Sequence, residues 1–321
     1  MKKYFLLIFG FIMLAMLLPG CSENQRRQSD KISIVATIFP QYDWVRQIIG
    51  EENMDRFELT LLIDNRIDLH SFNPSVSDIA RVKTADVFIY VGGHSDMWVR
   101  NVLRDANPDI VTLSLLRTLG ADLLIVDGVE VCEECGEIHD LYYQADEHVW
   151  VSLRRAKLIC KAIADMLAEI DPENAQVYRN NLETYLAKLS ALETEYQTAI
   201  EAASTSTLVI ADRFPFRYLV DDYGLNHYAA FHGCFAEAEA SFSTIISLAE
   251  NINRLGLDVI LVTESSDQSI ARTVINNTTS RNQRILVLDS IQSVTSSDVR
   301  DGVTYLSIME SNLQILIEAL G

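Results

Sequence analysis

The stretch that decides the fold lies at residues 171–200 and reads DPENAQVYRNNLETYLAKLSALETEYQTAI. Asp171 is a favourable helix N-cap, and Pro172 suits the first helical position, where its missing N–H costs no hydrogen bond. The residues that follow, up to Ile200, contain no glycine and no further proline. Apolar side chains recur there at steps of three and four: Tyr178, Leu182, Tyr185, Leu186, Leu189, Leu192, Tyr196 and Ile200. This spacing predicts one long helix with an apolar stripe along one face.

A helix of that length would extend for about 45 Å at a rise of 1.5 Å per residue, which is the width of a whole domain. Pairing in a coiled coil is one use for such a stripe. The alternative is a rigid helix laid across two lobes, which would limit hinge motion between them. The segments on either side favour this second use.

Strand-like and helix-like segments alternate on both sides of the stretch. Short, apolar and β-branched runs typical of strands occur at 32–38, 59–63, 87–91 and 109–113, and again at 207–211, 258–263 and 284–288. Segments with helical spacing lie at 42–49, 75–82, 95–103, 214–222, 242–255, 269–276 and 305–320. Such alternation is typical of parallel α/β sheets. We therefore expect an α/β protein in which two parallel-sheet lobes, 31–150 and 205–321, are joined by linking helices at 151–204.

The first 20 residues have the order of a secretory signal peptide. Lys2 and Lys3 precede an apolar stretch at 4–18 that is too short for a permanent membrane span. Leu18-Pro19-Gly20-Cys21 then fits the lipobox of bacterial lipoproteins, in which Cys21 is lipidated and becomes the mature N-terminus. An ordinary signal peptide with an incidental Cys21 is the alternative. The polar residues 21–30 are expected to form a tether.

Acidic residues dominate the charge balance. The chain carries 26 basic and 45 acidic residues, a net charge of −19, and the leader contributes two lysines and no acids. Nucleic acid and anionic membrane surfaces are therefore poor partners and cations good ones, so we expect membrane contact only through the lipid anchor. Cys132 and Cys135 are the one close cysteine pair, which a metal, a disulfide or two free thiols would explain equally well.

Two of the six histidines stand at positions suited to a metal ion. His70 lies in DLHSFNPSVSDI at 68–79, in the expected loop after a strand, where open α/β folds collect ligands. His148 lies in DEHVW at 146–150, between a loop rich in acidic residues and the start of a helix. Either histidine alone could be an ordinary surface residue, and the acidic loop could simply be solvated. Together they suggest capture of a metal ion.

Three parts of the chain resemble the signatures of one family, the zinc and manganese receptors of ABC transporters, which are metal-specific solute-binding lipoproteins. DLHSFNPSVSDIARVKTADVFIYVGG at 68–93 is similar to the first signature, DEHVW with DPENAQVYRNN to the second, and LDSIQSVTSSDVRDGVTYLSIMESNLQIL at 288–316 to the last. The resemblance covers essentially the whole chain after the leader. It implies the helical-backbone, TroA-like fold, and it implies that His70, His148 and Asp289 are metal ligands.

The same resemblance implies a biological setting. The cargo would be a divalent transition metal held in the cleft between the lobes, and the partners would be a permease and its ATPase. The receptor would be a monomer anchored by lipid on the outer face of the membrane, without enzymatic activity. We expect zinc, because two imidazoles suit a borderline-soft ion, whereas manganese, the alternative, normally takes a second carboxylate.

Arg213 departs from the pattern of the family. It stands in ADRFPFRYLVDDYGL where the resemblance places a histidine or glutamate ligand, and a guanidinium has no free lone pair to offer a metal. A water, Glu264 or His232 could complete a four-coordinate site, and the sequence does not choose among them. Because an unpaired buried charge beside a cation would be costly, we hypothesise that Arg213 pairs with a carboxylate. The candidates are Glu237, Glu239 and Glu264.

Two other functions fit parts of the sequence. A zinc hydrolase could also use two histidines and an aspartate around an ion with an open position. The sequence contains no H-E-x-x-H, no G-x-S-x-G and no Gly-rich phosphate loop, which argues against an enzyme. A surface adhesin that kept the receptor fold and lost its ion is the other candidate, motivated only by Arg213.

Overall fold

The computed structural model describes residues 31–125, 145–231 and 240–321. Several features predicted from the sequence lie outside these residues: the signal peptide, Cys21 with its tether, the Cys132/Cys135 pair, His232, Glu237 and Glu239. In the part of the chain that is described, no helix is long and apolar enough to cross a membrane.

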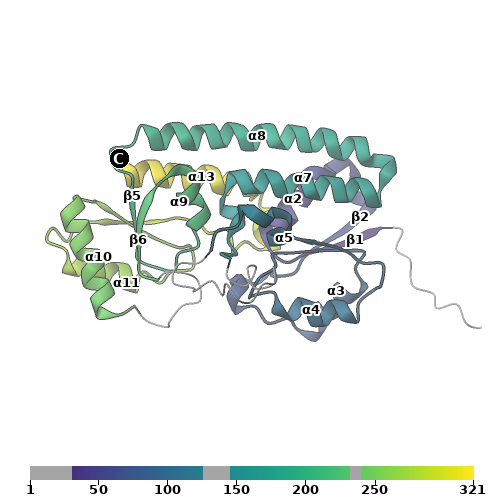
Figure 1. The fold of residues 1–321 in the computed structure, drawn as a ribbon, viewed down its shortest axis with the longest axis horizontal. Helices are drawn as coiled ribbons and strands as arrows, with labels where there is room; N and C mark the ends of the chain where they lie inside the picture. The colour runs from purple at the N-terminus through teal and green to yellow at the C-terminus, as the bar shows by residue number, and fades with distance from the viewer. Residues whose placement is uncertain (1–30, 126–144, 232–239) are drawn as a thin grey trace, which may run out of the picture. The chain divides into compact units, whose positions relative to one another are not determined.

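The first sheet contains four parallel strands in the order β2-β1-β3-β4. They are β1 (Ile32–Ala36), β2 (Phe57–Leu61), β3 (Val87–Tyr90) and β4 (Val111–Ser114). Helices α3 (Val76–Thr84) and α4 (Met97–Arg104) lie on one side, and α2 (Phe39–Ile49) and α7 (Leu153–Ile170) on the other (Figure 1). The short α5 (Leu115–Leu119) follows β4 directly. Cover on both faces explains why the central strands are continuous apolar runs.

The second sheet repeats this topology in the order β6-β5-β7-β8, again with all strands parallel. Its strands are β5 (Thr207–Ile210), β6 (Asn226–Ala229), β7 (Val259–Val262) and β8 (Arg284–Val287). The helices are α9 (Arg217–Tyr223), α10 (Phe242–Leu255), α11 (Ser269–Asn277), α12 (Ser296–Arg300) and α13 (Tyr305–Leu320). The predicted α/β class with two parallel-sheet lobes is confirmed. The edge strand β6 was missed, and the lobe boundaries at 150 and 205 stay a prediction.

The predicted long helix is α8 (Ala175–Glu201), which packs against α7 and α2 and also against α13 of the second lobe (Figure 1). Its apolar stripe is buried at Tyr178, Tyr185, Leu189, Leu192 and Tyr196. The stripe is thus covered within the chain, which is the second of the two predicted uses.

The N-cap predicted for this helix is wrong in one respect. A 3-10 turn, η5 (Pro172–Asn174), precedes α8, so Asp171 does not cap the long helix. The Asp171 carboxylate instead accepts hydrogen bonds from Tyr178 Oη (2.6 Å) and from the Arg56 guanidinium (2.9 Å). The carboxylate thus bonds to a buried hydroxyl and to a charged guanidinium, and a charged partner binds a carboxylate more strongly than a backbone amide does. In the 3-10 turn, Asn174 N donates to the backbone carbonyl of Asp171 instead.

A buried joint of hydrogen bonds connects the lobes. Asp43 on α2 accepts a hydrogen bond from the backbone N of Tyr305, the first residue of α13 (3.0 Å). Tyr305 Oη donates to the carbonyl of Trp150 (2.7 Å), and Trp150 Nε1 donates to the carbonyl of Ser290 (2.8 Å). One hydrophobic core runs continuously through both lobes. Bending at this joint would break satisfied, buried hydrogen bonds, so the connection is stiff.

Candidate metal site

His70 lies on the 3-10 turn η2 (Leu69–Ser71), in the loop that follows β2, as the sequence predicted. Asp68 precedes this turn, and its carboxylate accepts hydrogen bonds from Ser71 N (2.9 Å) and Ser71 Oγ (3.2 Å). The neighbouring Leu69 is buried in the hydrophobic core. The His70 side chain is only 7% exposed, so this imidazole is not an ordinary surface group.

His148 lies at the start of the 3-10 turn η4 (Val149–Val151), directly before α7. Its backbone N and its Nδ1 both donate to Asp146 Oδ1, over 2.9 Å and 2.8 Å. The side chains of both residues are buried, with exposures of 2% and 3%. An ionised carboxylate can only accept hydrogen bonds, so this contact fixes the proton of the imidazole on Nδ1 and leaves the lone pair on Nε2.

The two imidazoles meet, although 78 positions of sequence separate them. His70 Nε2 and His148 Nε2 lie 3.0 Å apart, and His70 Nδ1 lies 2.8 Å from Ser95 Oγ. In both rings Nδ1 is engaged by a partner behind the ring, and Nε2 points to the common centre. Burial, and then the proximity of His148, lowers the pKa of His70 to about 3. A neutral imidazole that offers the lone pair of Nε2 is the form that binds a metal ion.

The partners behind the rings could not be found from spacing alone. Ser95 N donates to Glu147 Oε1 (2.8 Å), and Glu147 Oε2 lies 3.6 Å from His70 Nδ1. Burial raises the pKa of Glu147 above its ordinary value. Gly93, at φ +120°, packs so closely on Glu147 that a Cβ would stand 2.7 Å from Oε1. The Gly92-Gly93 pair in the quoted first signature is therefore a signal that a backbone must pass close to another group.

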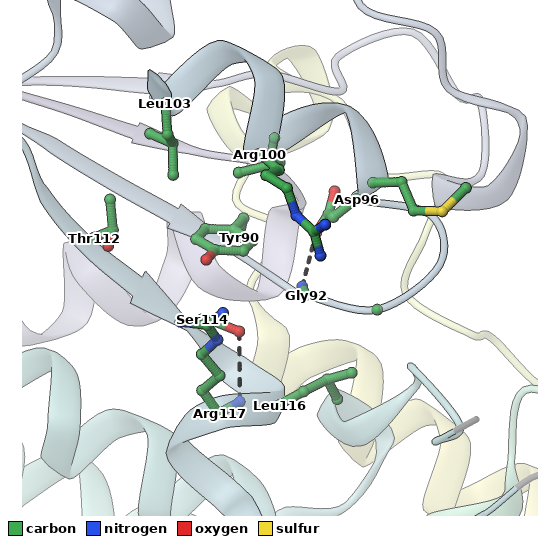
Figure 2. A pocket seen from close by; sticks show the side chains of 12 residues that line it. Tyr90, Gly92, Asp96, Arg100, Leu103, Thr112, Ser114, Leu116 and Arg117 are labelled. Atoms are coloured by element: carbon green, nitrogen blue, oxygen red, sulfur yellow. Dashed lines mark hydrogen bonds between the residues drawn. The ribbon is translucent and has the colours of Figure 1, made fainter. Parts of the chain in front are cut away.

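Figure 2 shows a hydrogen bond between Gly92 and Asp96 in the segment that joins β3 to α4. Asp96 Oδ2 accepts a hydrogen bond from Gly92 N (2.8 Å), and burial raises the pKa of Asp96 to about 7. The surrounding pocket has a volume of about 250 Å³ and lies at the carboxyl ends of β3 and β4. It is lined by Tyr90 and Arg117, among others, and by no residue predicted for the site. This pocket is thus separate from the paired histidines.

Two carboxylates form the corresponding group in the second lobe. Asp289 follows β8, and its Oδ1 accepts a hydrogen bond from Ile291 N (2.7 Å). Glu264 follows β7 and accepts from Ser290 N and Ser290 Oγ, both over 2.8 Å. Burial first, and then repulsion by Glu264, raises the pKa of Asp289 to about 7. A cation placed beside such a pair would relieve this repulsion.

A pocket of about 20 Å³ touches both lobes. Its lining includes Asp68 and His70 from the first lobe, and Arg213, Glu264 and Ser290 from the second. A volume of that size holds about one water molecule, which is also the scale of a single ion. The pocket thus gives the imidazole of His70 and the carboxylate of Glu264 a common opening.

The structure brings the predicted ligands together in two groups. His70 and His148 form one, and Asp289 with Glu264 forms the other. Across 31–125, 145–231 and 240–321, no group of three or more His, Cys, Asp or Glu side chains is arranged to hold a metal ion. The assignment of Asp289 or Glu264 to the same ion as the histidines therefore stays a prediction.

Arg213 pairs with a carboxylate, as we hypothesised, but the partner is not Glu264, the one candidate that lies within the described residues. Arg213 Nη1 forms an ion pair with Asp68 Oδ2 over 3.3 Å, across the lobes. Glu264 is instead used by the backbone and hydroxyl of Ser290. The Arg213 side chain is 42% exposed, so its charge is partly solvated and does not demand a buried partner. A pair at the rim of the site satisfies it.

Comparison with known proteins identifies relatives of this arrangement. The family model described as "ZnuA: Zinc-uptake complex component A periplasmic" matches residues 34–319. The zinc-binding lipoprotein AdcA of Streptococcus pneumoniae serotype 4 is 30% identical over 98% of this chain, which spans only 60% of that protein. The high-affinity zinc uptake system protein ZnuA of Bacillus subtilis strain 168 is 26% identical, over 95% of this chain and 94% of its own.

A solved structure has the same architecture. The Zn(II)-bound ZnuA-like domain of Streptococcus pneumoniae AdcA superimposes with a TM-score of 0.71 at 26% identity. The alignment covers 90% of this chain and 99% of that domain. The fold expected from the sequence is therefore the fold of this family.

Proposed function

The chain belongs to the zinc-uptake complex component A family, and from this premise we propose that it is the substrate-binding lipoprotein of an ABC transporter for Zn²⁺. One observation of this chain carries the proposal. His70 Nε2 and His148 Nε2 lie 3.0 Å apart in a buried setting, while Ser95 and Asp146 engage the opposite nitrogens. Paired imidazoles oriented in this way are the usual nitrogen donors for zinc.

The cargo ion would take its first two ligands from His70 and His148. Asp289 is the carboxylate that the family resemblance supplies, and Glu264, His232 or a water would complete four-coordination. Arg213 would stay outside the ligand set and hold Asp68 instead. Manganese remains the alternative cargo, because Asp289 and Glu264 together would supply the two carboxylates it prefers.

Capture would need little movement of the lobes. The continuous core and the hydrogen bonds of Tyr305 and Trp150 resist bending, so occupancy would be signalled to the permease by slight tilting or by ordering of loops. Lipid on Cys21 would hold the receptor at the outer face of the membrane, beside its permease and ATPase. We propose no enzymatic activity, in keeping with a solute-binding family.

The adhesin alternative is less favoured on the side of Arg213. It depended on this arginine as a sign of a degenerate site, and the ion pair with Asp68 accounts for the arginine without loss of the ion. The receptor is therefore the function that the geometry supports best.

Metal titration of the purified mature protein tests the proposal. We expect about one Zn²⁺ per chain, held more tightly than Mn²⁺ in competition with a chromophoric chelator. His70→Gln and His148→Gln should each weaken zinc binding, whereas His94→Gln, which removes an exposed imidazole from the turn next to Ser95, should not. Absence of zinc binding by the wild-type protein, or equal binding by all three variants, would reject the proposal.

A further inference from the structure

The same short pattern precedes both histidines. Asp68-Leu69-His70 and Asp146-Glu147-His148 each place an aspartate two residues before the imidazole. In both segments this aspartate organises the local backbone: Asp68 holds the turn through Ser71 N (2.9 Å), and Asp146 holds His148 N (2.9 Å). The position of each imidazole therefore depends on where its aspartate is held.

Each of these aspartates meets an arginine from one short segment of the second lobe. Arg213 Nη1 lies 3.3 Å from Asp68 Oδ2, and Arg217 Nε lies 3.5 Å from Asp146 Oδ2. The arginines are four residues apart, just before and at the start of α9. One short segment of the second lobe, residues 213–217, thus reaches the supports of both imidazoles in the first.

We infer that Arg213 and Arg217 are positioning residues that orient the two imidazoles for the cargo ion through Asp68 and Asp146. This inference rests on the proposed zinc-receptor function. We call the two ion pairs, Arg213–Asp68 and Arg217–Asp146, the arginine clamp. Through this clamp the second lobe sets the geometry of nitrogen donors that belong to the first.

Burial ranks the two pairs. The side chains of Arg217 and Asp146 are 10% and 3% exposed, whereas those of Arg213 and Asp68 are 42% and 25% exposed. Water screens the outer pair, so the inner pair carries most of the effect. Arg217 is therefore the more important positioning residue.

A neighbour of Arg217 holds the same aspartate by its backbone. Tyr218 Oη donates to the carbonyl of Asp146 (2.8 Å) and accepts from Leu124 N (3.2 Å). Asp146 N in turn donates to the carbonyl of Leu124 (2.8 Å). Adjacent residues of α9 thus hold the carboxylate and the carbonyl of Asp146, which leaves it little freedom to rotate.

The carboxylate of Asp146 links Arg217 to His148. Its Oδ1 lies 2.8 Å from His148 Nδ1, and its Oδ2 lies 3.5 Å from Arg217 Nε. A carboxylate held in this place accepts from Nδ1 and leaves the lone pair of His148 on Nε2. Arg217 would therefore act on the metal through Asp146 and His148 in series.

A double-mutant cycle on the full mature chain tests the clamp, with Zn²⁺ affinity measured by chelator competition. Arg217→Met and Asp146→Asn should each weaken zinc binding by roughly 10- to 100-fold, and the double variant by no more than Asp146→Asn alone. Arg217→Lys, which restores the charge, should recover part of the loss. Arg284→Met, which removes an exposed arginine paired with Glu318 in the second lobe, should bind as the wild type does.

A spectroscopic readout separates positioning from general damage to the fold. In ¹⁵N-histidine spectra of the zinc-free protein, His148 should be the Nδ1-protonated tautomer in the wild type and a mixture of tautomers in Arg217→Met. Losses that multiply in the double variant, or an unchanged tautomer and affinity in Arg217→Met, would overturn the clamp. If Arg217→Met does not fold, Arg217→Lys and Asp146→Asn carry the same test. A wild type that binds no zinc would instead reject the proposed function itself.

Discussion

The two halves of the candidate site differ in the kind and charge of the side chains that they contain. In the first lobe, His70 and His148 are buried imidazoles whose Nδ1 atoms are engaged by Ser95 and Asp146. In the second, Asp289 and Glu264 are neighbouring carboxylates whose mutual repulsion helps raise the pKa of Asp289 to about 7. The nitrogen half is arranged in advance by hydrogen bonds, and the oxygen half holds negative charge that a cation would neutralise.

This difference shows what each half can contribute to selectivity. Oriented imidazoles favour zinc over the harder cations, since nitrogen ligands suit a borderline-soft ion. Paired carboxylates attract any divalent cation and therefore contribute more to affinity than to selectivity between ions. We expect the nitrogen half to decide which ion binds, and the oxygen half to tune how binding depends on pH.

The largest expected effect comes from removing an imidazole. His148→Ala should weaken zinc binding by more than 100-fold, beyond the roughly 10- to 100-fold typical of partners outside the ligand shell, because a ligand itself is lost. Chelator competition at fixed pH measures the change. A loss below 10-fold would show that His148 is not a ligand and would remove the contrast between the two halves.

The buried His70 should make the zinc-free protein sensitive to acid. Its pKa is lowered to about 3 in the folded state, so between pH 6.5 and 3 the unfolded chain binds more protons, and stability falls as the pH falls. Between pH 6.5 and pH 4 this one group should cost about 3 kcal/mol of unfolding free energy. Denaturant unfolding of the wild type and of His70→Gln across this range measures the difference.

His70→Gln should remove the part of the pH dependence of the unfolding free energy that comes from His70, and should leave the part that comes from the carboxylates. Asp289 acts in the opposite sense, because its raised pKa stabilises the fold at low pH and this stability is lost as the pH rises through about 7. Parallel pH profiles for wild type and variant would contradict the account of a neutral, buried His70.

Asp289 should couple zinc binding to proton release. With a pKa of about 7 the carboxyl group is partly protonated at neutral pH, and coordination requires the ionised form, so zinc affinity should rise as the pH rises from 6 to 8. Asp289→Asn should flatten this dependence and weaken binding by roughly 10- to 100-fold, which is less than the loss of an imidazole because the asparagine amide keeps one oxygen acceptor. Calorimetric titrations in buffers of different ionisation enthalpy count the released protons.

Asp267→Asn is the matched control, since Asp267 is an exposed carboxylate of the same lobe. It should release as many protons as the wild type. If Asp289→Asn and Asp267→Asn behave alike, the oxygen half takes no part in binding.

The smallest effect should come from the rim of the site. Arg213→Met breaks a half-exposed ion pair with Asp68, and such pairs are worth roughly 0 to 1 kcal/mol, so zinc affinity should change by less than about fivefold. The change should shrink further in 0.5 M salt, where exposed charges are screened. Affinities measured at low and high salt test this, and a salt-independent loss of 100-fold would mean that Arg213 is a buried part of the site.

Features with a strong period were predictable from the sequence. Two lobes and a spanning helix were predicted from the apolar stripe of α8 and from the β-branched runs of β1, β3, β5 and β7. Burial of a defined face leaves such a repeat in the sequence. The strand β6 was missed since its segment, Asn226-His-Tyr-Ala229, is an edge strand with no buried residue and no apolar run. Edge strands need less apolar surface and so leave a weaker signal.

The residues of the candidate site also differ in whether the sequence alone could predict them. His70 and His148 could be picked out because imidazoles are rare in this chain and stand at the ends of expected elements. Ser95 and Arg217 could not, because their roles depend on contacts over 25 and 71 positions of sequence that only the fold creates. Asp68 was not among the partners predicted for Arg213. The prediction used charge alone, and charge does not show which of the 45 acidic residues lies beside Arg213 in the fold.

X-ray absorption at the zinc edge of the loaded protein tests the central claim most directly. We predict at least two imidazole nitrogens at about 2.0 to 2.1 Å, with oxygen among the remaining ligands, and one imidazole fewer in His148→Ala. A spectrum of the wild-type protein that contains only oxygen ligands, or one that His148→Ala leaves unchanged, would contradict the account.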